Sequence, residues 1–123
     1  MKNKKLINSF KYAFKGIGSS LKSERNMKIH FAMMVLVIIA GIFLNISMWE
    51  WIICFILFGL VISLEMVNTA IEIVVDMVSP EYNLKAGHVK DIAAGAVLVN
   101  AIVAFIVGLL IFLPKIIRLF IKF

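Results

Sequence analysis

Cysteine is nearly absent from this sequence of 123 residues, which has only Cys54. No disulfide can form within the chain, and a lone cysteine inside an apolar run is typical of a small packed or lipid-facing side chain. There is no internal repeat, low-complexity tract or linker, so we expect one domain over residues 1–123. No A-x-A cleavage site follows the first long apolar run, which begins only near His30, so we expect no cleavable signal peptide.

The phosphate-binding motifs of the common nucleotide-binding families are also missing. The chain has no G-x-x-x-x-G-K-[ST] sequence and no protein-kinase motif set. The stretch GIGSS at residues 16–20 is too short and wrongly placed for a phosphate-binding loop. A nucleotide, if one binds, must be held in another way.

Charged residues make up only 16% of the sequence, whereas hydrophobic residues reach 63% and the mean hydropathy is +1.04. This composition excludes a soluble domain with a polar surface, so lipid is the expected solvent. The pI of about 9.7 could suggest nucleic acid, but the basic residues flank the apolar runs. We therefore expect an anionic membrane surface as partner, and no nucleic acid.

The hydrophobic pattern predicts an all-α membrane protein. Over residues 4–22, apolar residues recur at helical spacing with lysines on the other side, which indicates an amphipathic helix in the membrane interface. Three apolar segments follow at about 31–48, 49–75 and 92–113, the last with Pro114 close behind. Each is long enough to span a hydrocarbon core, which takes about 20 helical residues.

The distribution of lysine and arginine predicts the orientation in the cell membrane. Eight precede the first span, none lies in the next link, and Lys85 and Lys90 lie in the link after that. The N-terminus and the second link are therefore expected on the cytoplasmic side. The C-terminal end then falls outside although it carries Lys115, Arg118 and Lys122. This conflict is reduced if the tail snorkels to lipid headgroups.

A polar stripe interrupts the second span. Its residues, spaced by three, four and four positions, share one helix face and are Glu65, Asn68, Glu72 and Asp76. If Trp49 lies at the outer interface, Glu65 is roughly 24 Å from it along the helix axis, just inside the cytoplasmic boundary of the hydrocarbon core. Glu72 is roughly 35 Å from Trp49, just beyond that boundary. Carboxylates on one stripe repel each other unless a cation lies among them, and a divalent ion with phosphates is the usual solution.

The neighbouring cytoplasmic segments offer matching groups. SERNMKIH supplies Glu24 as a further oxygen ligand, and HVKDIAAGA supplies Lys90 and Asp91 where the third helix is expected to begin. A helix N-terminus and a lysine both favour anions, so the set suits a polyphosphate with its magnesium ion. Phosphoryl transfer needs little beyond positioning, metal, charge and a base, and it is the expected reaction.

Other interpretations of these residues stay open. The stripe could be structural, or Glu65 could be the proton site of a small proton-coupled transporter, although a transporter leaves the cytoplasmic cluster unexplained. Asp76 is as typical of a solvated helix end as of a metal ligand. His30 and His88 are expected at the interface without a catalytic role.

Taken together, the motifs resemble one family. ExxNTAIE with Asp76 beyond it, followed by EYN and KDIAAGAVL, resembles the small prokaryotic integral-membrane diacylglycerol kinases, and ERNMKIH fits too. The resemblance covers nearly the whole chain. NTAIE with AAGAVL is most similar to the Gram-positive branch, whose members act mainly as undecaprenol kinases. The family often has arginine where this chain has Lys5, and arginine or lysine where it has Lys28. Lysine keeps the charge of arginine but not its bidentate geometry, so both residues are left out of the expected site.

The resemblance implies a homotrimer whose subunits each have a surface helix and three transmembrane helices. It implies transfer of the γ-phosphate of magnesium ATP to a lipid hydroxyl at the cytoplasmic interface, with undecaprenol as expected acceptor and diacylglycerol as the alternative. By motif, Glu65 is the proton acceptor and Asn68 supports the reacting centre, while the metal ligands are Glu24 and Glu72. Besides these two glutamates, the implied nucleotide contacts are Tyr12, Glu81, Tyr82, Asn83, Lys90 and Asp91.

Overall fold

The computed structural model describes residues 2–122 and has four α-helices and no strand in that range. The helices are α1 (Lys2–Ser23), α2 (Arg25–Leu44), α3 (Met48–Val78) and α4 (Leu84–Ile121). The all-α prediction is confirmed. As the apolar runs predicted, α2, α3 and α4 are each long and apolar enough to cross a membrane. The chain is therefore a multi-pass membrane protein.

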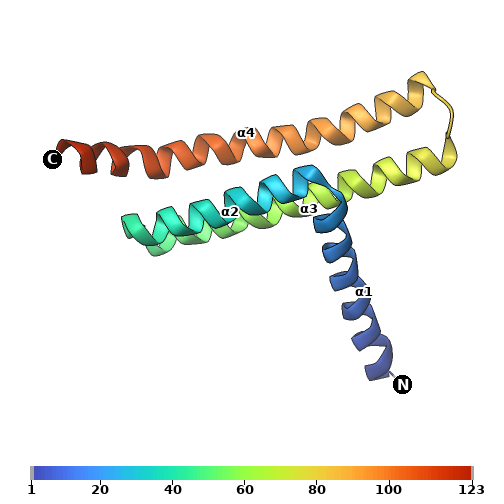
Figure 1. Cartoon of the computed structure of the whole chain (residues 1–123), viewed down its shortest axis with the longest axis horizontal. Helices are drawn as coiled ribbons and strands as arrows, with labels where there is room; N and C mark the ends of the chain where they lie inside the picture. The colour runs from blue at the N-terminus through green and yellow to red at the C-terminus, as the bar shows by residue number, and fades with distance from the viewer. Residues whose placement is uncertain (1, 123) are drawn as a thin grey trace.

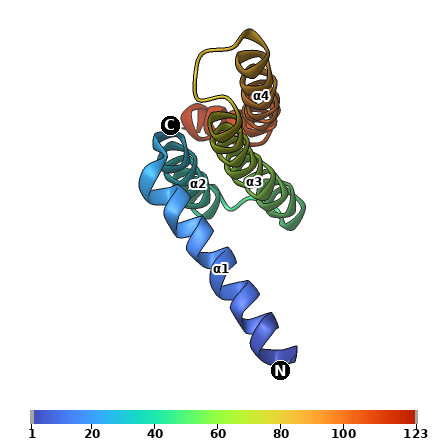
Figure 2. The ribbon, with the colours of Figure 1, turned by 90° about the vertical axis from the view of Figure 1, so that its right-hand side faces the viewer.

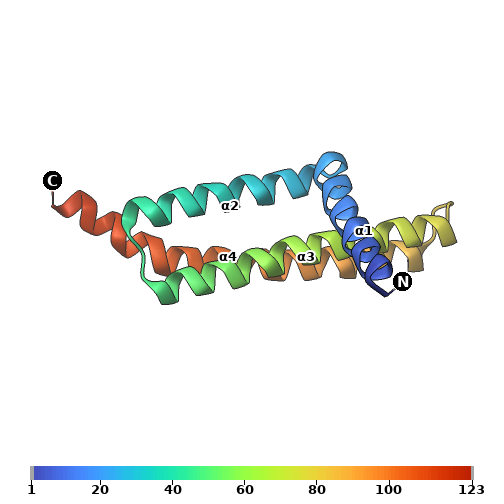
Figure 3. The ribbon, with the colours of Figure 1, turned by 90° about the horizontal axis from the view of Figure 1, so that it is seen from below.

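The three apolar helices run side by side, and α1 leaves them at a steep angle (Figures 1 and 3). Seen end-on, α1 extends away from the other three (Figure 2). Within the described residues, α1 contacts α2 and α3 but not α4. Beyond the point at which α1 turns off, α3 and α4 continue, so their linked ends project past α2 (Figure 1).

Complementary helix caps close the corner between α2 and α3. Asn45 has a φ of 52°, a left-handed conformation that asparagine tolerates, and the N–H groups of Asn45 and Ile46 donate back to the last turn of α2. Ser47 then begins α3 with a capping box, in which its hydroxyl and the Glu50 carboxylate each accept a backbone N–H. The expectation that the first helix runs to residue 48 is wrong, because the turn at Asn45 ends it at Leu44.

Close packing between α2 and α3 lies under this corner. A Cβ on Gly41 would come within 2.6 Å of the Trp51 ring, so the two helices can approach only because residue 41 has no side chain. Lys115 Nζ lies 3.1 Å from the Glu50 carboxylate and ties α4 to α3 at the same end. One of the three basic residues that conflicted with the orientation rule thus has an acidic partner. The buried cluster beside this corner consists of Ile46, Cys54 and Ile111.

The last helix is longer at both ends than predicted. It was expected to begin near Lys90, but α4 begins at Leu84, because Asn83 Oδ1 accepts two N–H groups of its first turn. It also continues through Pro114 to Ile121. Proline removes one helical hydrogen bond, but here it does not end the helix. At 38 residues, α4 is about 57 Å long, well beyond a hydrocarbon core of about 30 Å.

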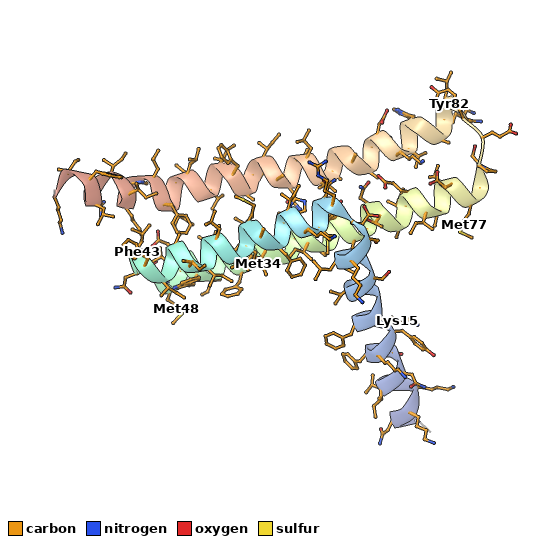
Figure 4. The ribbon with its side chains drawn as sticks, viewed as in Figure 1. Lys15, Met34, Phe43, Met48, Met77 and Tyr82 are labelled. Atoms are coloured by element: carbon orange, nitrogen blue, oxygen red, sulfur yellow. The ribbon has the colours of Figure 1, made fainter. Side chains whose placement is uncertain are left out.

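Most apolar side chains are exposed in the single chain. They project outward along all four helices in Figure 4, from Phe43 and Met48 at one end to Met77 at the other. So much exposed apolar surface is unfavourable in water. Lipid, or further copies of the chain, must cover it.

Candidate active site

The polar stripe of α3 changes from buried to exposed along the helix. Glu65 is only 2% exposed and Asn68 7% exposed, whereas Glu72 is half-buried and Asp76 is exposed. One continuous helix carries all four, as their spacing predicted. The buried end lies among the apolar helices, and the exposed end lies on the projecting part of α3.

Hydrogen bonds within α3 join two members of the stripe to each other and a third to the neighbouring Thr69. Asn68 Nδ2 donates to Glu72 Oε1 at 3.3 Å, and Thr69 Oγ1 donates to the backbone carbonyl of Glu65 at 3.1 Å. Asn68 Oδ1 is buried and has no hydrogen-bond partner among the described residues. A buried amide oxygen without a donor costs on the order of 1–3 kcal/mol, so this atom is free to accept a hydrogen bond from water, a ligand or a second chain.

Glu65 meets a residue that the sequence interpretation set aside. His30 Nε2, on α2, lies 3.6 Å from Glu65 Oε2. Of the described residues, His30 is the only one placed in an ion pair with Glu65. The histidine stands near the start of an apolar helix, where an ionisable side chain is unusual, and that position was the signal that could have identified it.

Two cavities share His30 in their lining. The first, which we call the apolar cavity, has a volume of about 460 Å³ and is lined by residues within 29–37 of α2, 54–62 of α3 and 101–112 of α4. The second, the Glu65 pocket, has about 250 Å³ and is lined by Asn26, Ile29, His30, Glu65, Ala94, Val97, Leu98 and Ala101. Three residues line both: Ile29, His30 and Ala101. A buried carboxylate therefore stands next to a space suited to a hydrocarbon chain.

The exposed end of the stripe has a cationic partner. Lys90 Nζ on α4 pairs with Asp76 Oδ1 on α3 at 2.5 Å, and both side chains are solvent-accessible. The lysine places one positive charge beside the stripe, while the divalent ion expected among the carboxylates stays a prediction. The expectation that Lys90 and Asp91 stand at the N-terminus of the last helix is wrong, because α4 begins at Leu84 and places both residues well inside it.

Comparison with known proteins identifies the family. The family model for prokaryotic diacylglycerol kinase matches residues 11–112. The chain belongs to that family. It is 44% identical to an undecaprenol kinase of Bacillus subtilis over 90% of each chain. It is also 40% identical to a diacylglycerol kinase of Synechocystis, over 93% of this chain and 66% of the relative. To a diacylglycerol kinase of Haemophilus influenzae it is 32% identical, over 87% of this chain and 92% of the relative.

The family match includes every residue expected in the site, from Tyr12 to Asp91. Membership in a family of lipid kinases confirms the resemblance seen in the motifs. It favours the kinase over the proton-coupled transporter and the purely structural stripe, because those alternatives rested on Glu65 and its neighbours alone.

The other residues that the family resemblance implied are scattered in the single chain. Tyr12 is on α1 and exposed, and Tyr82 is exposed in the link between α3 and α4 (Figure 4). Glu81 also lies in this link, next to Asn83, whose side chain caps α4. Because α1 makes no contact with α4 within the described residues, one chain does not bring Tyr12 to Asp91.

The acidic residues fit a magnesium site only in part. Glu24 is the N-cap residue of α2, but its side chain makes no capping hydrogen bond. The Glu72 carboxylate accepts a hydrogen bond from Asn68. No group of three or more His, Cys, Asp or Glu side chains in the described chain could hold a metal ion. Magnesium in enzymes that use nucleotides is usually bound by one or two carboxylates, with phosphates and waters as the other ligands. The oxygen donors of Glu24 and Glu72 therefore suit a magnesium ion that arrives with a polyphosphate.

Proposed function

We propose that the protein is an undecaprenol kinase that uses ATP and magnesium. The observation that carries this is the position of Glu65, a buried carboxylate in the Glu65 pocket, which shares Ile29, His30 and Ala101 with the apolar cavity. The cavity suits a segment of the isoprenoid chain of the acceptor, and the pocket suits its hydroxyl. The 44% identity to an undecaprenol kinase supports this acceptor.

The reaction forms one bond and breaks one. The lipid hydroxyl oxygen attacks the γ-phosphorus of ATP, the bond from that phosphorus to the ADP oxygen breaks, and the hydroxyl proton passes to the Glu65 carboxylate. Asn68, one turn along α3, keeps a buried oxygen available for a donor and holds Glu72 through its nitrogen. The lipid phosphate then leaves with its headgroup toward the membrane surface.

On the aqueous side, Glu24 and Glu72 hold the magnesium ion of ATP, which when bound neutralises charge on the phosphates. Lys90 and Asp91 on α4 bind the nucleotide together with Tyr12, Glu81, Tyr82 and Asn83. The ion pair of Lys90 with Asp76 keeps its ammonium beside the stripe. That arrangement favours a phosphate group arriving at Glu72.

Residues from a second chain complete this site. We propose a homotrimer in the cell membrane, with the active site on the cytoplasmic side and residues 1–123 as one domain. Three facts support further copies: the exposed apolar faces of α2 to α4, the orphaned oxygen of Asn68, and the separation of α1 from α4. α1 lies in the membrane interface, where Leu6, Phe10 and Phe14, all exposed in the single chain, enter the lipid.

Diacylglycerol is the second candidate acceptor, because other relatives are diacylglycerol kinases. Purified protein in bilayer vesicles is given γ-labelled ATP with undecaprenol or with diacylglycerol, at equal mole fraction. We expect labelled undecaprenyl phosphate at a rate at least about tenfold above labelled phosphatidic acid. A faster rate with diacylglycerol would mean that diacylglycerol, not undecaprenol, is the acceptor. If no lipid is labelled and a pH gradient drives substrate flux without ATP, the protein is a transporter and not a kinase.

A further inference from the structure

The pair formed by His30 and Glu65 contains an ionisable residue that the proposed reaction does not use. Glu65 is almost fully buried, at 2% exposure, and burying a carboxyl group without a hydrogen-bond or charge partner is costly. The Thr69 hydroxyl donates a hydrogen bond to the backbone carbonyl of Glu65 and not to its carboxylate. His30 is the residue that faces the carboxylate itself.

The distance allows a closer contact. The separation of 3.6 Å is longer than an N–H···O bond, which is usually about 2.9 Å. Hydrogen bonds in active sites are often long before substrate binds and tighten in the complex. Because His30 approaches Oε2, the other oxygen of Glu65 is left for the acceptor hydroxyl.

His30 also lies where an acceptor must pass. It lines both the apolar cavity and the Glu65 pocket, together with Ile29 and Ala101. Those two neighbours have no polar side-chain atom, so of the three residues at the junction only His30 can hydrogen-bond. A lipid whose chain occupies the cavity and whose hydroxyl reaches Glu65 therefore lies beside the imidazole.

From this geometry we propose that His30 is a positioning residue, which donates a hydrogen bond from Nε2 to Glu65 Oε2 and so aims the other carboxylate oxygen at the lipid hydroxyl. The inference rests on the proposed function through the role of Glu65 as proton acceptor. It also assigns the proton of the imidazole to Nε2, the nitrogen that faces Glu65.

The test compares three variants. His30→Leu removes the donor, His30→Gln keeps an N–H near the place of Nε2, and His88→Leu is the matched control on exposed surface of α4. We expect His30→Leu to lower kcat for undecaprenol about tenfold or more, since a hydrogen bond to a charged group is typically strong enough for that change. The KM for magnesium ATP should stay unchanged, His30→Gln should recover most of the rate, and His88→Leu should match the unaltered protein.

A second readout does not depend on turnover. With glutamate labelled at its side-chain carboxyl carbon, solid-state ¹³C NMR in bilayers reports the five glutamates of the sequence, and the signal missing from Glu65→Gln is that of Glu65. We expect His30→Leu to shift this signal, His30→Gln to return it toward its original position, and His88→Leu to leave it in place. Should His30→Leu fail to fold, His30→Phe keeps an aromatic ring without a donor.

The two readouts separate the proposals. If His30→Leu leaves both the Glu65 signal and kcat unchanged, His30 does not position Glu65. This conclusion holds even if the protein phosphorylates undecaprenol. A decrease in kcat that His30→Gln does not recover, or one that comes with an increased KM for ATP, also overturns the role of His30. If neither lipid is phosphorylated but the Glu65 signal shifts, the pair is real and the proposed reaction is wrong, and the positioning role falls with it.

Discussion

Where α2 passes into α3, the chain is capped, paired and closely packed, whereas farther along the same helices a pocket opens beside a buried carboxylate. At the packed corner, Gly41 and Trp51 are in contact and Glu50 has Lys115 as its partner. Around Glu65, by contrast, a pocket stays open and Asn68 keeps an oxygen without a donor among the described residues. The same three helices build both regions.

The difference indicates what each region contributes. Satisfied caps and close packing stabilise the native arrangement, so changes at the corner should alter stability and leave chemistry intact. Open space and unpaired polar atoms cost stability, and proteins retain them mainly where a ligand or partner completes the site. Changes around Glu65 should therefore alter activity more than stability.

The largest effect is expected for Glu65→Gln. It keeps the size of the side chain and removes the group that accepts the hydroxyl proton, so lipid phosphorylation should decrease by about 100-fold or more. ATP binding should remain, because Glu65 lies at the lipid side of the site. Initial rates with labelled ATP, together with binding of a fluorescent ATP analogue, check both statements.

The control for this variant is Glu50→Gln, at the packed corner, which can keep the capping box because glutamine also serves at that position. It should phosphorylate lipid at the rate of the unaltered protein. Equal activity in Glu65→Gln and Glu50→Gln would show that Glu65 is not the proton acceptor. It would also show that the two regions do not differ in their contribution to activity.

A smaller effect is expected for Glu72→Gln, on the exposed side of the stripe. We expect the free magnesium concentration for half-maximal rate to increase by at least about tenfold, because even residues behind metal ligands commonly change metal affinity that much. Glu24→Gln should behave in the same way. The measurement is the initial rate over a magnesium titration, and an unchanged titration in both variants would exclude both as ligands.

The helices could be predicted from the sequence because hydrophobic runs and charge flanks are local signals. Their ends could not, since two ends depend on single asparagines. Asn45 ends α2 by adopting a left-handed conformation, and Asn83 begins α4 by capping it. Pro114 indicated a helix end from local rules, yet α4 continues through it, as the surrounding helix can absorb one lost hydrogen bond.

The stripe on α3 was also predictable, because its spacing is a property of one helix. The contacts of Glu65 and Asp76 were not, as they depend on how α2 and α4 pack against α3. His30 reaches Glu65 from α2, and Lys90 reaches Asp76 from α4. Sequence spacing within one helix does not determine such contacts between helices.

At the packed corner, Gly41→Ala tests packing alone. The added Cβ would meet the rigid Trp51 ring, so we expect the variant to lose about 1–2 kcal/mol despite the better helix propensity of alanine. Gly59→Ala is the matched control on α3, where a Cβ meets nothing within 4 Å. Thermal unfolding in detergent should show a lower Tm for Gly41→Ala and an equal or higher Tm for Gly59→Ala, with lipid phosphorylation per folded molecule unchanged in both. Equal Tm shifts would mean that the corner is looser than its contacts indicate.

The smallest effect is expected for the ion pair of Lys115 and Glu50, whose side chains are both partly accessible. Lys115→Met keeps most of the apolar stem and removes the charge, while Glu50→Gln removes the partner charge. Ion pairs with accessible side chains usually contribute at most about 1 kcal/mol. Each single substitution should therefore lower the free energy of unfolding by less than about 1 kcal/mol. The double variant should lose less than the sum of the two single losses. Additive losses would show that the two charges do not interact, and any loss of kinase activity per folded molecule would show that the corner is coupled to Glu65 after all.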